Sequence, residues 1–583
     1  MPEPQDDLFL QKRLLLASVL SAVALTVYVY VAGSSAPPAE PQPAPQTIEE
    51  SAPAAPAAEA PGSPEETSPQ GSAAAAEQPA TSEEVRAAQG EERFTVETDT
   101  YAVSFSNRGA VVTNWTLKDY TAADGERLDL VHAPGAEKYG FPFAMARPGG
   151  EAIDAVNKAL FVVNREEGPQ LGSSMVVFEY ADSSISARKS FHFAREGYLL
   201  RVESELTENG RPQPHLLTWN SGFGDTDQLQ NYLYSSTFYY DVPLRSLERN
   251  PAADAEEARI VNSGNYLFAG IDDLFFTATF LPPQPEAPLR LETSAVQIVT
   301  AEGGSPEIYA AIGVGSNGEG RNDLQLFVGP KSIDILRGVR PEMGQAVDFG
   351  WFGFVAEPLF WMLRWTHEHV VANWGWAIVV VTVFINFVMF PLKWKSMKSM
   401  KKMQSLQPLV KQINEKYKGL SMRDPKKAQQ NEEMMALYKK HGVNPLGGCM
   451  PMLLQLPFFI GFYNVLTVAI EMRHASWLWV ADLSSPEQLA IRVLPLAMIL
   501  TQFWQQSMTP TPTADPAQMR LMKFMPLMMG FIFYGFSAGL VLFWLTGNIV
   551  GIAQQLILNR FASDDKVFID QPRGRKKKKA KSD

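Results

Sequence analysis

The sequence predicts a polytopic α-helical membrane protein with six transmembrane helices and a large all-β sandwich domain outside the cytoplasm. Uncharged apolar stretches of membrane-spanning length occur near the N-terminus and repeatedly after residue 372. Between residues 91 and 345, short runs alternate apolar and polar residues and end in turn residues, as β-strands do. Lys and Arg gather in two segments of the membrane part, and such segments stay in the cytoplasm.

The chain averages describe none of these parts separately. The 583 residues carry a formal net charge of −12 and have a mean hydropathy of −0.11. These values exclude a chain that lies in the membrane throughout, and a DNA-binding protein that relies on overall basicity. A single cysteine, Cys449, excludes a disulfide scaffold and a cysteine-based zinc or iron–sulfur site.

Residues 1–32 form a short cytoplasmic stub followed by a transmembrane anchor. Lys12 and Arg13 precede Leu14–Ala32, a stretch of 19 residues without a charge. At about 1.5 Å per residue this stretch just spans a hydrocarbon core of about 30 Å. The alternative is a cleaved signal peptide, because small residues follow from Gly33. Its apolar region would be longer than usual, so an uncleaved anchor is favoured.

Residues 33–90 are rich in Ala, Pro, Glu and Ser and have almost no aromatic residues, which predicts a disordered linker. Residues 91–345 then alternate apolar and polar positions, for example at Tyr101, Val103 and Phe105. Turn sequences such as Glu208–Gly210 separate the runs. Because no helical pattern alternates with these runs, we expect an antiparallel β-sandwich and not a parallel α/β sheet.

Residues 346–371 predict an amphipathic helix that lies in the membrane interface. The segment is rich in aromatic residues, among them Trp351, Trp361 and Trp365, and carries a few charges. Indole rings favour the headgroup region, which supports this position.

Residues 372–560 predict a core of five transmembrane helices. Three apolar segments are Trp374–Leu392, Cys449–Ile470 and Ile491–Met508. The fourth, Leu521–Leu558, has 38 residues, and as one helix it would be almost twice as long as the bilayer core is thick. We therefore expect it to fold back at Gly535–Gly539 and to form two short spans.

The basic segments orient these spans. Residues 393–448 contain 13 Lys or Arg and 4 Asp or Glu, and residues 559–583 contain 9 and 4, whereas residues 33–371 contain 23 and 48. The positive-inside rule places the hairpin at 393–445 and the tail at 561–583 in the cytoplasm, and the β-domain outside. With six spans, both termini are cytoplasmic.

The cytoplasmic hairpin predicts two helices, Met397–Tyr417 and Pro425–His441, with a break near Gly419–Asp424. Its charges could simply be solvated and set the topology. Alternatively, the hairpin is a docking site that moves over the membrane part.

Polar residues within the spans lie mostly in their cytoplasmic halves. Thr382 and Asn386 are four residues apart and share a helix face. The other residues with this placement are Gln455, Gln502, Gln505, Gln506, Thr546, Asn548, Gln554 and Gln555. Any one of them could serve only as an interhelical hydrogen bond. Their common placement on four helices favours a polar cavity that opens to the cytoplasm and is closed outside.

Several motifs resemble a known family. Asn444–Cys449 and the following Pro451–Pro457 are similar to the sequence that enters the third span of the YidC/Oxa family of membrane protein insertases. Further matching motifs are Met389–Leu392, Met508–Pro510, Asp515–Pro516, Lys523–Pro526 and Gly539–Leu542 with Asn548. The resemblance covers roughly residues 345–560. The anchor and β-domain resemble the Gram-negative form, which has a large periplasmic sandwich domain.

The resemblance implies a multi-pass protein of the bacterial inner membrane that inserts and folds nascent membrane proteins, alone or with the Sec translocon. It implies a hydrophilic groove open to the cytoplasm, while the apolar segment of the substrate slides into lipid. Such a protein is not an enzyme and needs no cofactor, and the sequence has no nucleotide-binding motif. The residues that we assign to the groove are Thr382, Asn386, Gln455, Gln502, Gln506, Trp544 and Asn548.

One position departs from the family pattern. Where the family usually has an arginine or lysine in the second span, this chain has Asn386. A neutral amide can hydrogen-bond a carboxylate but cannot attract it over a distance. We therefore expect a wet but uncharged groove and little dependence of insertion on the charge of the substrate.

The basic tail has two possible partners. Its cations are Arg573, Arg575, Lys576, Lys577, Lys578 and Lys579. They could bind anionic membrane lipids. They could also contact ribosomal RNA together with the hairpin, and this second partner is favoured.

Other function classes fit less well. A polytopic transporter or channel predicts charged residues or paired broken helices at the membrane midplane, and the spans have almost no charge. A membrane enzyme would have to use His367-Glu368-His369, which lacks a third metal ligand at a useful spacing. A periplasmic chaperone with one anchor would leave five spans without a purpose.

Overall fold

The computed structural model describes residues 85–561, apart from gaps at 123, 168–173, 227–230, 285–286, 300–305, 317–319, 420–423, 425, 444–449 and 509–515. The predicted anchor at 14–32 and nearly all of the predicted linker lie outside the described residues. So do the motif Asn444–Cys449, most of the motif Met508–Pro510, Asp515, and the tail after residue 561.

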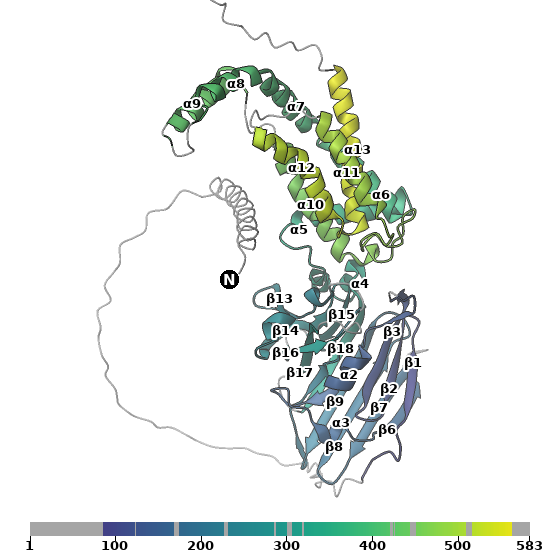
Figure 1. Cartoon of the computed structure of the whole chain (residues 1–583). Coiled ribbons are helices and arrows are strands. Elements are labelled where there is room, and N and C mark those ends of the chain that lie inside the picture. Colours follow the sequence, from purple (N-terminus) through teal and green to yellow (C-terminus); the bar gives the residue numbers. More distant parts are fainter. Residues whose placement is uncertain are drawn as a thin grey trace, which may run out of the picture. The chain divides into compact units, whose positions relative to one another are not determined.

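The β-domain consists of two antiparallel sheets (Figure 1). The smaller sheet has the order β1-β2-β3-β4, with bounds Arg93–Glu97, Tyr101–Ser106, Val111–Thr121 and Arg127–Asp129. The larger sheet has 14 strands in the order β5-β11-β17-β16-β14-β15-β18-β9-β8-β7-β6, with β10, β12 and β13 attached at its side. The all-β domain expected from the sequence is confirmed.

The bounds of the larger sheet's strands are as follows. They are β5 Ala144–Ala146, β6 Val162–Glu167, β7 Ser174–Ala181, β8 Ile185–Phe193, β9 Leu199–Glu208, β10 Arg211–Pro212, β11 Leu216–Trp219, β12 Ser236–Asp241, β13 Ser246–Pro251, β14 Ile260–Asp272, β15 Phe276–Leu281, β16 Pro288–Ile298, β17 Glu307–Ser316 and β18 Arg321–Pro330. Short helices α2 Ala133–Tyr139, α3 Asp154–Asn157 and α4 Ile333–Val339 lie between or after the strands.

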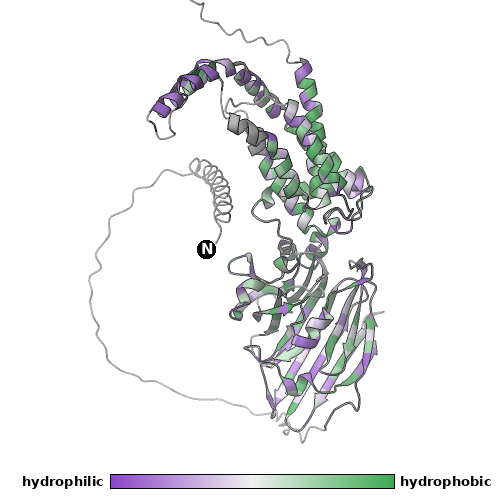
Figure 2. Ribbon diagram, in the orientation of Figure 1, coloured by the Kyte–Doolittle hydropathy of each residue, from purple (hydrophilic) through white to green (hydrophobic). Residues whose placement is uncertain are grey.

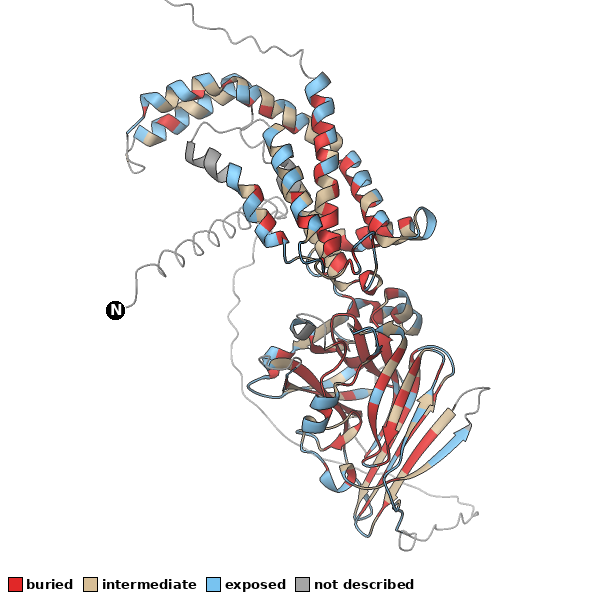
Figure 3. Cartoon of the chain, turned by 45° about the vertical axis from the view of Figure 1, so that its right-hand side comes forward, coloured by how far each residue is buried: buried red, intermediate tan, exposed pale blue. Residues whose placement is uncertain are grey.

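Aromatic side chains join the two sheets. Phe105 on β2 packs against Phe191 and Phe178 of β8 and β7, with ring centroids 5.0 and 5.5 Å apart. Trp115 on β3 packs against Trp219 on β11 at 6.3 Å. Alternate residues of a strand point to opposite faces, so the period-two pattern of the sequence lines this interior. In Figure 3, buried positions run along the strands.

The ordered part of the β-domain begins before the expected boundary at residue 91. The backbone N–H of Arg86 donates to the carbonyl of Ala181 at 2.9 Å, and that of Ala88 donates to Leu160 at 3.0 Å. These residues belong to the segment predicted as linker. Composition could not predict that these residues are ordered, because their ordering comes from backbone pairing with distant strands.

The second half of the chain is helical, and its helices after α4 are α5 Gly353–His369, α6 Trp374–Val388, α7 Phe390–Ser405, α8 Gln407–Lys416, α9 Lys426–Lys440, α10 Met450–Val468, α11 Val493–Met508, α12 Pro516–Phe533 and α13 Ala538–Phe561. Helix α13 packs against α11 and α6, and α5 packs against α10. Figure 2 shows largely hydrophobic α10 and α13 and a largely hydrophilic α9.

Among the described residues, one helix, Ala538–Arg560, is long and apolar enough to cross a membrane alone. A second stretch is long and apolar enough only when two helices are taken together: Trp374–Val388 and Phe390–Ser405, which are bent by 56°. Two shorter apolar helices are Gln455–Val468 and Lys523–Phe533. The predicted turn at Gly535–Gly539 is present, because α12 ends at Phe533 and α13 begins at Ala538.

The boundary expected between the second span and the hairpin is wrong. The sequence predicted a span to Leu392 and a hairpin helix from Met397, but α6 ends at Val388 and α7 runs without a break from Phe390 to Ser405. Pro391 occupies the first turn of α7, where a proline fits because its missing N–H needs no partner. The chain therefore bends at Met389 and leaves the bundle as one continuous helix.

The loop after α10 contacts the β-domain. The Arg473 guanidinium pairs with Asp225 at 2.6 Å, and both side chains are almost fully buried. The same guanidinium donates to the carbonyl of Thr121 at the end of β3. Removing one partner of such a pair would leave a buried charge uncompensated, so the contact fixes this loop in place.

Candidate functional site

Two predicted groove residues lie on one face of α6. The Thr382 hydroxyl donates to the carbonyl of Ile378 at 2.6 Å. The Asn386 amide Nδ2 donates to the carbonyl of Thr382 at 2.8 Å. Both side chains are buried, at 0% and 4% exposure. The spacing of four residues places them on the same face, as predicted.

Asn386 also contacts two other helices. The ammonium group of Lys393, on α7, donates to Asn386 Oδ1 at 2.6 Å. Gln554 Nε2, on α13, donates to the Asn386 carbonyl at 3.0 Å. An added Cβ at Gly547 of α13 would lie 4.0 Å from the Asn386 amide nitrogen, so the two helices approach closely here. Side chains from α6, α7 and α13 thus meet at Asn386.

Lys393 brings an ammonium group to Asn386, where the sequence alone predicted no cation. The neutral residue at position 386 holds a cation through its own amide oxygen, so a positive charge lies within hydrogen-bond distance of it. From the sequence, Lys393 belongs only to the basic hairpin. Its contact with Asn386 arises from the bend of 56° between α6 and α7, which helical spacing does not predict.

A second polar group joins α11 and α13. Trp544 Nε1 donates to Gln502 Oε1 at 2.9 Å. Asn548 Nδ2 lies 3.2 Å from Thr501 Oγ1 and 3.3 Å from the carbonyl of Met498. The Trp544 ring packs on Phe459 of α10 at 5.1 Å. The structure therefore places Gln502, Trp544 and Asn548 along one contact between helices.

Gln455 and Gln506 lie half-buried on α10 and α11. The hydrogen bonds of Asn386, Gln502 and Asn548 are the interhelical bonds that the alternative interpretation of each polar residue predicts. The predicted tail contacts, Arg573, Arg575, Lys576, Lys577, Lys578 and Lys579, lie outside the described residues.

Apolar side chains cover the outward face of α6 beside this cluster. Phe384 is 54% exposed and Phe387 is 74% exposed. On α12, Phe524 and Phe531 are 65% and 86% exposed. Faces of this kind are stable only in lipid or against another apolar surface.

The three residues of His367-Glu368-His369 point to different partners. The His367 ring stacks on Trp374 with centroids 4.1 Å apart. His369 Nδ1 lies 3.1 Å from the carbonyl of Trp365. Glu368 accepts from Arg364 Nε at 2.7 Å, and this hydrogen bond lowers the pKa of the carboxyl group. The three side chains thus have separate hydrogen-bond and stacking contacts, and among the described residues no group of His, Cys, Asp and Glu could hold a metal ion.

Comparison with known proteins covers nearly the whole described chain. Residues 93–362 match the model of the YidC periplasmic domain, and residues 365–566 match that of the 60Kd inner membrane protein family. The chain is 31% identical over 571 residues to the membrane protein insertase YidC of Pelobacter propionicus, covering 95% of this chain and 100% of that protein.

Further relatives carry the same name. The membrane protein insertase YidC of Ralstonia nicotianae is 31% identical over 502 residues, covering 84% of this chain and 86% of that protein. The crystal structure of YidC from Thermotoga maritima is 13% identical, covers 81% of this chain and 99% of that chain, and has a TM-score of 0.30.

Proposed function

This chain belongs to the YidC family of membrane protein insertases, and we propose that the polar cluster around Asn386 receives the hydrophilic part of each nascent substrate. The protein is an inner-membrane insertase with a periplasmic β-domain, and it is not an enzyme. Its substrates are nascent membrane proteins.

One observation carries the proposal. Asn386 lies buried in an apolar bundle, and residues of three helices converge on it with a cation among them. A polar group in hydrocarbon is costly unless it is paired. Such a cluster offers a passing hydrophilic segment replacement partners for the water that it loses.

The rest of the substrate needs an apolar path. The exposed aromatic side chains of α6 provide one directly beside the cluster, because Phe384 and Phe387 lie on the same helix as Asn386. A hydrophobic segment that packs on this face loses contact with water while its hydrophilic flank still touches the cluster. It then moves into lipid without an external energy source, since burial of apolar surface is favourable.

The membrane arrangement in this proposal has six spans with both termini in the cytoplasm. The anchor Leu14–Ala32 is the first, α6 with the start of α7 is the second, and α10 to α13 are the remaining four. Several of these helices are short for a bilayer; α11 has only 16 residues. Short spans thin the surrounding bilayer, which shortens the path of a hydrophilic segment.

Three partners belong to this proposal. The Sec translocon would act beside the chain for larger substrates. The ribosome would meet the basic hairpin and tail, and anionic lipids are the other candidate for the tail. The separation of basic cytoplasmic segments from an acidic exterior part supports these contacts.

Insertion into proteoliposomes tests the role of the cluster. The substrates are two versions of one short membrane protein, with an acidic or a neutral translocated tail. Because Lys393 supplies a cation, we expect the wild-type chain to insert the acidic version modestly better. Lys393→Gln should remove that preference, which is a change of roughly threefold in the ratio of inserted acidic to inserted neutral substrate. Asn386→Arg should strengthen the preference.

Lys395→Gln is the matched control, because Lys395 is exposed on the same helix. It should leave the preference unchanged. If Lys393→Gln and Asn386→Arg insert both substrates as the wild type does, the cluster only stabilises the bundle and the proposal is wrong.

A further inference from the structure

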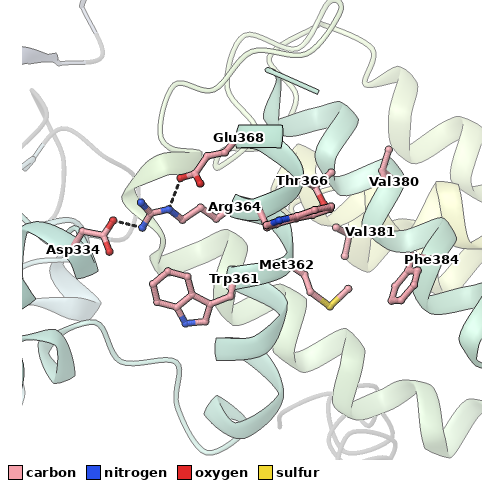
Figure 4. A pocket seen from close by; sticks show the side chains of 10 residues that line it. Asp334, Trp361, Met362, Arg364, Thr366, Glu368, Val380, Val381 and Phe384 are labelled. Carbon is pink, nitrogen blue, oxygen red and sulfur yellow. Dashed lines mark hydrogen bonds and ion pairs between the residues drawn. The ribbon is translucent and has the colours of Figure 1, made fainter. Parts of the chain in front are cut away.

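A cavity lies between α5 and the middle of α6, and Asp334 of α4 lines it as well. It has a volume of about 750 Å³, within the range of small-molecule sites. Figure 4 shows its two ends: Asp334, Arg364 and Glu368 lie at one, and Val380, Val381 and Phe384 lie at the other. The cavity is therefore amphipathic along its length.

The polar end is a small charged network. The Arg364 guanidinium pairs with Asp334 of α4, and its Nε donates to Glu368 at 2.7 Å. Two carboxylates and one guanidinium give this end one net negative charge. A guanidinium has five N–H groups, so Arg364 can hold both carboxylates and still donate to a phosphate oxygen.

The apolar end is continuous with the outward face of α6. Val380 and Phe384 are 37% and 54% exposed, and Phe387 continues the same face one turn further on. Trp361 and Trp365 also line the cavity and are 37% and 58% exposed. Tryptophan favours the headgroup level of a bilayer, where an apolar and a polar region meet.

We propose that this cavity binds one phospholipid with a primary amine headgroup, of the phosphatidylethanolamine class. The ammonium group lies between Asp334 and Glu368, the phosphate accepts from Arg364, and an acyl chain follows Val380 and Phe384. The charge of the polar end determines which class of lipid binds, because a net negative charge there attracts an ammonium group and repels an anionic headgroup. The site depends on the chain lying in the inner membrane, and its apolar end shares Phe384 with the apolar path of the proposed function.

Lipid retention tests the site directly. The full chain is reconstituted in nanodiscs with equal amounts of phosphatidylethanolamine, phosphatidylcholine and phosphatidylglycerol, and the retained lipids are counted by native mass spectrometry after release into detergent. We expect phosphatidylethanolamine to be retained most. Phosphatidylcholine should follow, since its headgroup nitrogen is positively charged but has no N–H donors. Phosphatidylglycerol should be retained least.

Charge variants make the test sharper. Glu368→Gln neutralises the rim and should lower retention of the amine lipid about threefold to tenfold. Combining it with Asp334→Asn leaves Arg364 alone and should reverse the preference toward phosphatidylglycerol. Glu357→Gln is the matched control: Glu357 lies on α5 but pairs with Arg337, outside this cavity.

Two outcomes would overturn the proposal. One is equal retention of the three lipids in the wild type, or an unchanged preference in the double variant. The other is a photo-crosslinker at Val380 that captures protein, such as the chain's own anchor at 14–32, in place of lipid. Insertion activity is measured in parallel. The headgroup contacts at Asp334, Arg364 and Glu368 include neither Asn386 nor Lys393, so loss of lipid selectivity and loss of the tail-charge preference are separate readouts.

Discussion

At the scale of single residues, the β-domain interior holds titratable groups whose protonation is fixed by their neighbours. His215 is 2% exposed; its Nδ1 lies 3.1 Å from the carbonyl of Gln213, and its Nε2 lies 2.7 Å from Ser204 Oγ. A carbonyl can only accept, so Nδ1 carries the hydrogen and Nε2 accepts from the serine. Burial, with a smaller contribution from Lys189, lowers the pKa of His215 to about 4.

This pKa predicts acid sensitivity of the β-domain. An unfolded histidine binds a proton near pH 6.5, whereas folded His215 binds it only near pH 4, so the unfolded state gains protons first as the pH falls. The free energy of unfolding should fall between pH 6.5 and 4 by about 3 kcal/mol from this group. Thermal unfolding of the full chain in detergent, followed by the β-sheet circular dichroism signal, measures this loss.

His215→Gln removes the titrating ring. The free energy of unfolding of this variant should therefore depend less on pH between 6.5 and 4 than that of the wild type, even if the variant is less stable at pH 7. An equal loss in both proteins would show that carboxylates, and not His215, set the acid limit.

Single residues are also where sequence reasoning reached its limit. The face shared by Thr382 and Asn386 was predictable because helical spacing alone determines it. The contact of Lys393 with Asn386 was not predicted, since it depends on the bend between α6 and α7. The pairing of Trp544 with Gln502 likewise requires knowing which helices pack together.

At the scale of elements, one glycine controls how α6 meets the loop that follows α10. A Cβ added at Gly375 would lie 2.2 Å from Trp477 Cδ1 and 2.5 Å from Trp477 Cβ. Trp477 is 7% exposed and packs on Trp376 with ring centroids 5.5 Å apart. Because the clash reaches the tryptophan Cβ, rotation of the ring alone cannot relieve it.

Gly375→Ala should therefore destabilise the protein. Overpacking costs about 1–3 kcal/mol, which exceeds the gain of up to about 1 kcal/mol that alanine brings to a helix. The thermal unfolding temperature in detergent should fall, and tryptophan emission should shift as Trp477 moves. Gly338→Ala is the control, since an added Cβ in α4 meets no atom within 4 Å. A Gly375→Ala protein as stable as the control would contradict this packing.

The boundaries of helices could be predicted from the sequence where a particular type of residue determines them. The return between α12 and α13 was predictable, because 38 nearly uncharged residues are too long for one span and a glycine pair marks the turn. The boundary of the second span was not, although Pro391 offered a signal for a new helix start. Hydropathy reports where a chain is apolar and not where its axis bends.

At the scale of the whole molecule, charge is distributed unevenly along the chain. Residues 33–371 include 23 basic and 48 acidic residues, whereas the segment at 393–448 has 13 and 4. The overall value of −12 conceals this separation. The β-domain was predictable from period-two patterning, but the order of its strands was not, because long-range pairing leaves no local trace in the sequence.

The two candidate partners of the basic tail, ribosomal RNA and anionic lipid, should respond differently to deletion of the tail and to salt. Six cations lie between Arg573 and Lys579. If they bind ribosomal RNA phosphates, the association constant should fall with salt at a log–log slope of about −4 to −5. Deleting residues 573–583 should flatten that slope and reduce co-sedimentation with ribosomes at low salt.

Binding to liposomes with and without anionic lipid separates the alternatives. A chain whose Lys576, Lys577, Lys578 and Lys579 are replaced by Gln keeps the tail's length and tests charge alone. It should behave as the deletion does, since phosphate attraction depends on charge and not on sequence. If the deletion leaves ribosome co-sedimentation unchanged but weakens binding to anionic liposomes, the tail is a lipid anchor, and the hairpin becomes the candidate for the ribosome contact.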